Sequence, residues 1–108
     1  MDGEVNYEGI TSTNWRDTQS KEVAPGIFER IIWEGEAGKR AVVLEFQAGA
    51  KFPSVDSHQS GPEQIYVISG VFSDGQADYA EGSFIHNPLG SAHIPQSKTG
   101  CIVLITFP

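Results

Sequence analysis

Residues that could bind a metal ion occur in two separated parts of the chain. Asp56, His58 and Glu63 lie close together, and His93 follows thirty residues after Glu63. Residues two positions apart in an extended strand point to the same face, so we expect Asp56 and His58 to share one. The turn sequence at 59–62 would let Glu63 return toward that face. Imidazole nitrogens with carboxylate oxygens suit zinc, iron, nickel or manganese rather than calcium.

Each of these residues also has an ordinary structural interpretation. A histidine at the end of a strand is commonly a surface or turn residue, and carboxylates beside a turn are commonly solvated. Cys101 begins an apolar run and favours a core thiol over a ligand or redox sensor. His86 favours a rim position over a fifth ligand. Spacing alone therefore leaves the metal site and the structural interpretation both open.

Short runs rich in valine, isoleucine, phenylalanine and tyrosine, separated by glycine and proline, predict strands that could position these residues. Residues 27–33 and 39–46 flank a Gly-Glu-Ala-Gly turn and predict a hairpin. No segment has a long apolar stripe at helical period, and only one short helical turn is expected, near residues 14–16. The chain is therefore predicted to be all-β and antiparallel, closed on itself or folded as two facing sheets. The remaining predicted strands are 64–69, 71–73, 76–80, 83–87 and 101–107.

Composition excludes several classes of protein. The 108 residues suffice for one domain, and a formal charge of −7 disfavours nucleic acid or an anionic membrane as partner. The longest apolar run, residues 101–105, is far shorter than the roughly 20 residues that span a bilayer. A single cysteine forms no internal disulfide, and the acidic N-terminus resembles no secretory signal. We expect a cytoplasmic protein.

A family resemblance adds to these patterns. Gly82, Pro88, Gly90 and His93 match G-x5-P-x-G-x2-H, the second signature motif of the cupins, and residues 49–70 resemble the first, G-x5-H-x-H-x3-4-E-x6-G. More narrowly, the chain resembles the cupin domain of ChrR-type anti-sigma factors. The resemblance implies an antiparallel cupin double-stranded β-helix, the RmlC-like jelly-roll β-barrel. It rests on residues 49–53, 63–74, 79–83, 87–93 and 100–101.

The resemblance also implies a metal held by two histidines and a glutamate of the first motif and by the histidine of the second. By position, His58, Glu63 and His93 take three of these places, and Asp56 stands where the family has histidine. The aspartate would shift the preference from zinc toward iron or manganese. Alternatively, Asp56 would hold a ring N–H of a ligand histidine.

The alignment to the first motif has a second possible register. One additional residue lies between Gly49 and Asp56, and an ungapped register would place Ser57 and Gln59 opposite the family histidines. That register would leave Glu63 and His93 alone as ligands, which would bind a transition metal poorly. We favour the register that uses His58. The asparagine that often closes the second motif is Ser97 here.

These observations favour one function and keep two others open. We expect residues 1–24 to form an N-terminal segment packed on the barrel and residues 25–108 to form a single cupin domain. The favoured function is a stand-alone metal-binding cupin in a sensing or accessory role, because the first twenty-five residues lack the cysteines and histidines of a zinc-binding anti-sigma domain. The resemblance to other short cupins implies an alternative, a non-haem metal-dependent dioxygenase of a small diketone or aromatic ketone. A third possibility is a metal-free barrel that binds a small molecule. We expect a homodimer.

Overall fold

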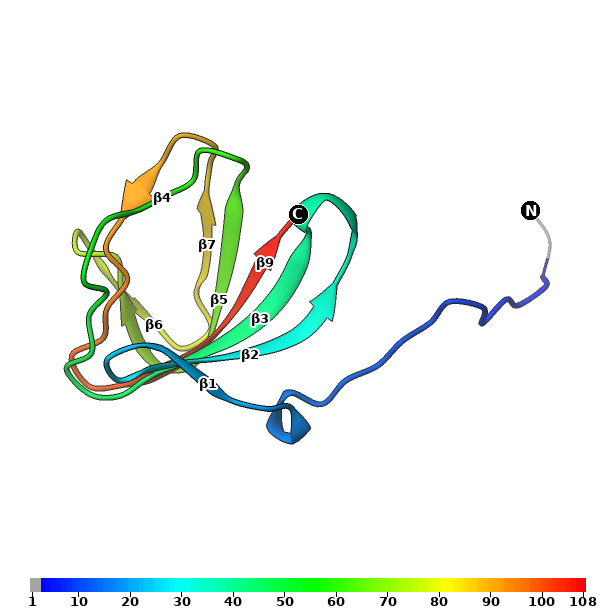
Figure 1. The fold of residues 1–108 in the computed structure, drawn as a ribbon, viewed down its shortest axis with the longest axis horizontal. Coiled ribbons are helices and arrows are strands. Elements are labelled where there is room, and N and C mark those ends of the chain that lie inside the picture. The colour runs from blue at the N-terminus through cyan, green and yellow to red at the C-terminus, as the bar shows by residue number, and fades with distance from the viewer. Residues whose placement is uncertain (1–2) are drawn as a thin grey trace.

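The computed structural model describes residues 3–108, and their regular structure is antiparallel β-sheet with two short 3-10 turns (Figure 1). All paired strands run antiparallel, as predicted. The 3-10 turns are η1 (Trp15–Asp17) and η2 (Glu36–Gly38). The strands are β1 (Lys21–Ala24), β2 (Ile27–Glu34), β3 (Arg40–Phe46), β4 (Asp56–Ser57), β5 (Glu63–Ser73), β6 (Asp78–Ala80), β7 (Phe84–Asn87), β8 (Ala92–His93) and β9 (Cys101–Phe107).

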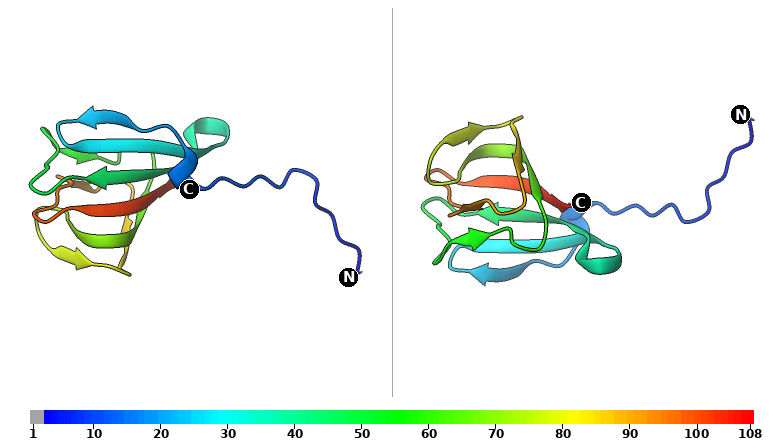
Figure 2. Two further views of the ribbon diagram at one scale, coloured as in Figure 1. Left: turned by 90° about the horizontal axis from the view of Figure 1, so that it is seen from below. Right: turned by 90° about the horizontal axis from the view of Figure 1, so that it is seen from above.

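One long sheet forms most of the molecule. Its strand order is β1-β2-β3-β9-β5-β6, with β7 also paired to β5, and β4 and β8 form a separate pair. Figure 2 shows the strands of the long sheet stacked in this order, and Figure 1 shows the sheet curving toward β4. This is the predicted jelly-roll arrangement, and it brings residues from both signature motifs to one end of the fold.

The predicted hairpin and last strand are confirmed. The hairpin is β2–β3, and the run from 101 to 107 is β9, which pairs with both β3 and β5. The prediction of two strands at 64–69 and 71–73 is wrong, because β5 continues through Gly70. That residue has φ +78°, and a register shift against β9 lies between Val67 and Ser69. The irregularity bends the strand without ending it.

Alternate residues of β3, β5 and β9 form the core, as the period of a strand requires. Cys101 lies among them and is 5% exposed, which confirms the expected core thiol. Burial raises the pKa of this thiol to about 11, so it is protonated and unreactive at neutral pH. The ring of Phe72 on β5 contacts Phe46 edge-on, and Ile27 and Ala50 complete the core. The core side chains on the three strands are Val42, Leu44, Phe46, Ile65, Val67, Phe72, Cys101, Val103 and Ile105.

The N-terminal segment meets the sheet only in part. Lys21–Ala24 form β1 and pair with β2, and the predicted helical turn is η1, where Arg16 donates its backbone N–H to the Asn14 side chain. The Arg30 guanidinium lies over the Trp15 ring. Residues 3–14 are exposed and extend away from the sheet in Figure 1. Within the described residues, no helix is both long enough and apolar enough to cross a membrane.

Candidate metal centre

The short β4–β8 ladder places the first pair of candidate ligands opposite each other. Asp56 pairs with His93 in the register of these two strands. The Asp56 Oδ2 atom lies 3.3 Å from Nε2 of His93. Two residues that are far apart in sequence are thereby held at contact distance by backbone hydrogen bonds.

A glycine turn from the second motif fixes His58. The backbone N–H of His58 donates to the Ser91 carbonyl at 2.9 Å, and the His58 carbonyl accepts from the Gly90 N–H at 2.8 Å. Gly90 has φ +88°, a conformation that strongly favours glycine. The Pro-x-Gly part of the second motif therefore positions a candidate ligand of the first motif, and His58 becomes buried at 6% exposure.

Glu63 is the first residue of β5 and is only 3% exposed. It pairs in register with Asn87 of β7, and the Asn87 Nδ2 atom donates to Oε1 of Glu63 at 3.3 Å. Sequence reasoning missed Asn87 as part of the site. The only sequence feature that marks Asn87 is its position directly before Pro88 of the second motif. The β5–β7 register then places it opposite Glu63.

All four predicted side chains converge. Their donor atoms lie within 4.8 Å of one another. The Nε2 atoms of His58 and His93 are 3.1 Å apart, and Oε1 of Glu63 lies 3.5 Å from the first and 3.4 Å from the second. Bonds of about 2.1 Å to a shared ion would separate neighbouring donors by about 3.0–3.4 Å. The separations among His58, Glu63 and His93, and the 3.3 Å between His93 and Asp56, are close to these values and compatible with a shared metal ion.

Protons satisfy this cluster less well than a metal ion does. Nε2 of His93 faces three potential acceptors, on Asp56, His58 and Glu63, and it can carry one proton. A cation at the common centre would instead accept a lone pair from every donor. Ser57 and Gln59, the alternative pair from the ungapped register, are exposed.

A family comparison covers nearly all of the chain. The model of the ChrR cupin-like domain family matches residues 8–107. The chain belongs to the ChrR cupin-like family. No curated protein sequence matches this cupin.

Solved structures show the same fold at low sequence identity. This cupin is 23% identical to an RmlC-like cupin from Shewanella frigidimarina, with TM-score 0.76 over 88% of this chain and 86% of that one. A second match is a chain in the structure of Rhodobacter sphaeroides SigE in complex with the anti-sigma ChrR, at 22% identity and TM-score 0.75. This match covers 88% of this chain and 51% of that one. The polyketide cyclase RemF from Streptomyces resistomycificus is 18% identical, with TM-score 0.79 over 92% of this chain and 79% of that one. These likenesses establish the cupin fold.

Two other residues considered from the sequence lie outside the cluster. His86 is exposed on β7, with Nδ1 3.3 Å from Nε2 of Gln64. Ser97 is buried, where its hydroxyl donates to the Val71 carbonyl at 2.6 Å and accepts from the Gly100 N–H at 2.9 Å. Ser97 therefore closes a loop in this cupin and holds no part of the cluster.

The carboxylates change the ionisation of His93. Burial by itself lowers the pKa of an imidazole, but the hydrogen bonds and charges of Asp56 and Glu63 outweigh it and raise the pKa of His93 to about 9. The hydrogen bond from His93 lowers the pKa of Asp56 against the opposing effect of burial. In the absence of metal, His93 is therefore protonated at neutral pH, and an incoming metal ion must displace this proton.

The metal-free protein is expected to lose stability as the pH rises through about 9. The pKa of His93 is about 9 in the folded state against 6.5 for an unperturbed histidine, so its contribution is complete below 6.5 and lost above 9. The loss should be on the order of 3 kcal/mol. Urea unfolding with a chelator present, for the wild type and His93→Gln at each pH, measures it. The difference in the free energy of unfolding between the two proteins should shrink at high pH. A difference that stays constant with pH would contradict the raised pKa of His93.

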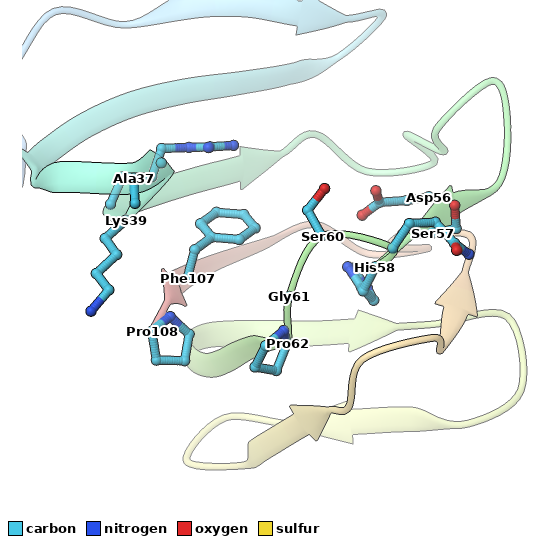
Figure 3. A pocket seen from close by; sticks show the side chains of 13 residues that line it. Ala37, Lys39, Asp56, Ser57, His58, Ser60, Gly61, Pro62, Phe107 and Pro108 are labelled. Carbon is cyan, nitrogen blue, oxygen red and sulfur yellow. The ribbon is translucent and has the colours of Figure 1, made fainter.

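Two neighbouring spaces adjoin the cluster. An outer pocket of about 370 Å³ opens beside Asp56, His58 and Ser60 (Figure 3). An inner cavity of about 210 Å³ lies over the inner face of β3, β9 and β5. Arg40, Asp56 and Phe107 line both spaces, so the two spaces lie on either side of these three side chains.

Proposed function

We propose that this cupin binds one divalent transition metal ion and acts in a sensing or accessory role, through a small molecule that reaches the metal. The observation that carries the proposal is the convergence of four donor atoms within 4.8 Å at the junction of two short strands and a glycine turn. His58, Glu63 and His93 would be ligands, with Asp56 as a fourth. When bound, the metal would supply a coordination position for the small molecule.

The donor set supports a preference for iron or manganese over zinc. Two carboxylates give a harder set than the histidine-rich set that the family resemblance implies. Their two negative charges also balance those of a divalent cation once His93 has lost its proton. Asp56 is the most accessible donor, with a side chain that is 33% exposed. This exposure supports approach of a small molecule from the Asp56 side.

A metal analysis tests this proposal. Protein purified without chelator should contain about one metal ion per chain, and chelated protein reloaded with iron, manganese, zinc or nickel should recover the same stoichiometry. Each bound metal should raise the unfolding temperature relative to the chelated control. A chain that takes up none of these ions would contradict the proposal and favour a metal-free cupin that binds a small molecule.

A metal-dependent dioxygenase is the second candidate, and the inner cavity is the observation that favours it. Most of the cavity wall is apolar, and two of the candidate ligands, Asp56 and Glu63, also line it. The apolar wall would hold an apolar substrate beside the metal. Oxygen uptake by the iron-loaded protein with β-diketones and aromatic ketones tests it. Turnover of any of these compounds would establish a dioxygenase. No turnover with any of them would favour the sensing or accessory role.

The proposal includes a homodimer in the cytoplasm. Small β-rich domains commonly assemble as symmetric pairs, and the acidic charge of −7 suits a protein that avoids nucleic acid and anionic membranes. Light scattering coupled to size-exclusion chromatography decides the oligomeric state.

A further inference from the structure

Arg40 places a positive charge beside the acidic cluster. It is the first residue of β3 and shares the inner face of that strand with Val42 and Leu44, because side chains of a strand alternate between faces. Its partner across β9 is Phe107, and the Arg40 guanidinium carbon lies 4.2 Å from the centroid of the Phe107 ring. This cation–π contact holds the guanidinium at the end of the fold where the metal cluster lies.

The strand register sets Arg40 level with Glu63. In the β5–β9 pair, Gln64 lies opposite Thr106, so Glu63 lies beside Phe107 one position further along. Arg40, Phe107 and Glu63 thus form one row across β3, β9 and β5. Neighbouring strands are about 4.8 Å apart, so the backbones of Arg40 and Glu63 are separated by about 10 Å. The side chains of both residues line the inner cavity, so one small molecule there can contact both ends of this row.

Within residues 3–108 the Arg40 guanidinium forms no ion pair, although Glu34 of β2 lies opposite Arg40 in the strand register. The ion pairs in the described residues all join His58 or His93 to Asp56 or Glu63. Arg40 is half-buried and lines both the outer pocket and the inner cavity. A guanidinium held this way presents donors suited to a carboxylate.

The inner cavity sets the rest of the ligand's chemistry. Its volume of about 210 Å³ is below the roughly 300–1,000 Å³ of most ligand pockets, so the occupant must be small. Glu29 also lines the cavity, but it pairs with Leu44, four residues along β3 from Arg40 and about 13 Å away. An anionic group therefore belongs at the Arg40 end. The rest of the lining is apolar and includes the core side chains Val42, Leu44, Ile65, Phe72 and Ile105.

We propose that the ligand of this site is a small organic carboxylate with an apolar body. Its carboxylate lies between the metal ion and Arg40, and its apolar body fills the inner cavity. This inference rests on the proposed function, because without a divalent ion the charges of Asp56 and Glu63 would repel an anion. With the ion bound, its two positive charges balance those of Asp56 and Glu63. The positive charge of Arg40 in the lining of both spaces is then left to attract an anion.

Cobalt(II)-loaded protein provides the test, because its visible spectrum reports changes at the metal. Titration with benzoate should alter the spectrum of the wild type, and titration with the neutral analogue benzamide should not. Arg40→Met should weaken benzoate binding at least about tenfold, the effect of losing one charge-assisted hydrogen bond. Arg40→Lys, which retains the charge but not the paired donors, should weaken it less.

Lys39→Met is the matched control. It removes the same charge from the adjacent residue, which lines the outer pocket but not the inner cavity and whose side chain extends away from Asp56 and His58 in Figure 3. Its affinity for benzoate should equal that of the wild type. An equal loss in both methionine variants would mean that only the overall charge matters and would overturn the proposal.

Cobalt stoichiometry separates this inference from the proposed function. A wild type that takes up no metal overturns both. A wild type that binds cobalt but responds to neither probe, responds equally to both, or is unaffected by substitution of Arg40 overturns only the carboxylate ligand. If Arg40→Met fails to bind cobalt, the comparison of Arg40→Lys with Lys39→Met decides, and equal benzoate affinity in these two variants overturns the inference.

Discussion

His93→Ala is expected to reduce the affinity for a divalent metal ion by more than about 100-fold. His93 is central to the cluster, since its Nε2 atom lies within 3.4 Å of donor atoms on Asp56, His58 and Glu63. Loss of a residue that merely supports a ligand costs about 10–100-fold in affinity, so loss of a central ligand should cost more. Competition with a chromophoric chelator measures the constant.

His86→Ala is the control for this prediction. His86 is an exposed histidine whose ring contacts Gln64 and is not part of the cluster. The control should retain the affinity of the wild type, and Asp56→Asn should show whether the carboxylate binds the ion directly. A folded His93→Ala protein with undiminished affinity would place the metal elsewhere and end the assignment of all four ligands.

Gly70→Ala is expected to destabilise the protein by at least about 3 kcal/mol, a large fraction of the stability of a small domain. A Cβ atom at position 70 would lie 2.2 Å from the Gly100 carbonyl oxygen and 2.8 Å from Cα of Cys101, both backbone atoms of the facing segment. Gly70 also has φ +78°, which alanine adopts only with strain. The substitution therefore forces β5 and β9 apart at the edge of the core. Urea unfolding with a chelator present measures the change.

Gly82→Ala separates the steric clash of an added Cβ atom from the strain of a positive φ. Gly82 has φ +91°, but a Cβ atom there would meet nothing within 4 Å. Its cost should be limited to the conformational strain of about 1–2 kcal/mol. Equal destabilisation by the two substitutions would show that backbone conformation alone matters and that β5 and β9 tolerate separation at Gly70.

The sequence predicted the parts of the fold that depend on local pattern. The β2–β3 hairpin follows from two alternating runs around a glycine-rich turn, and β9 follows from an apolar run between a glycine and the end of the chain. The continuation of β5 through Gly70 was not predicted, because glycine usually marks the end of a strand. The packing against Cys101 that keeps Gly70 within the strand comes from a distant segment.

The chemistry of the donors was readable from residue types, and their convergence was not. Two imidazoles and two carboxylates predict a transition metal wherever they meet, and the second motif associated His93 with the others. Asn87 and Arg40 were absent from the predicted site. Asn87 contacts Glu63 only through the β5–β7 register, and Arg40 stands level with Glu63 only because β9 lies between β3 and β5.

By itself, the amino-acid sequence determined the class of fold and the kind of ion that its side chains could hold, since both follow from residue type and short-range alternation. The tertiary structure decided which donors meet, because Asp56 faces His93 only through the pairing of two two-residue strands. It also decided that His58 is held by the backbone around Gly90. Such contacts depend on the register of distant segments, which the packing of the whole domain selects and no local pattern encodes.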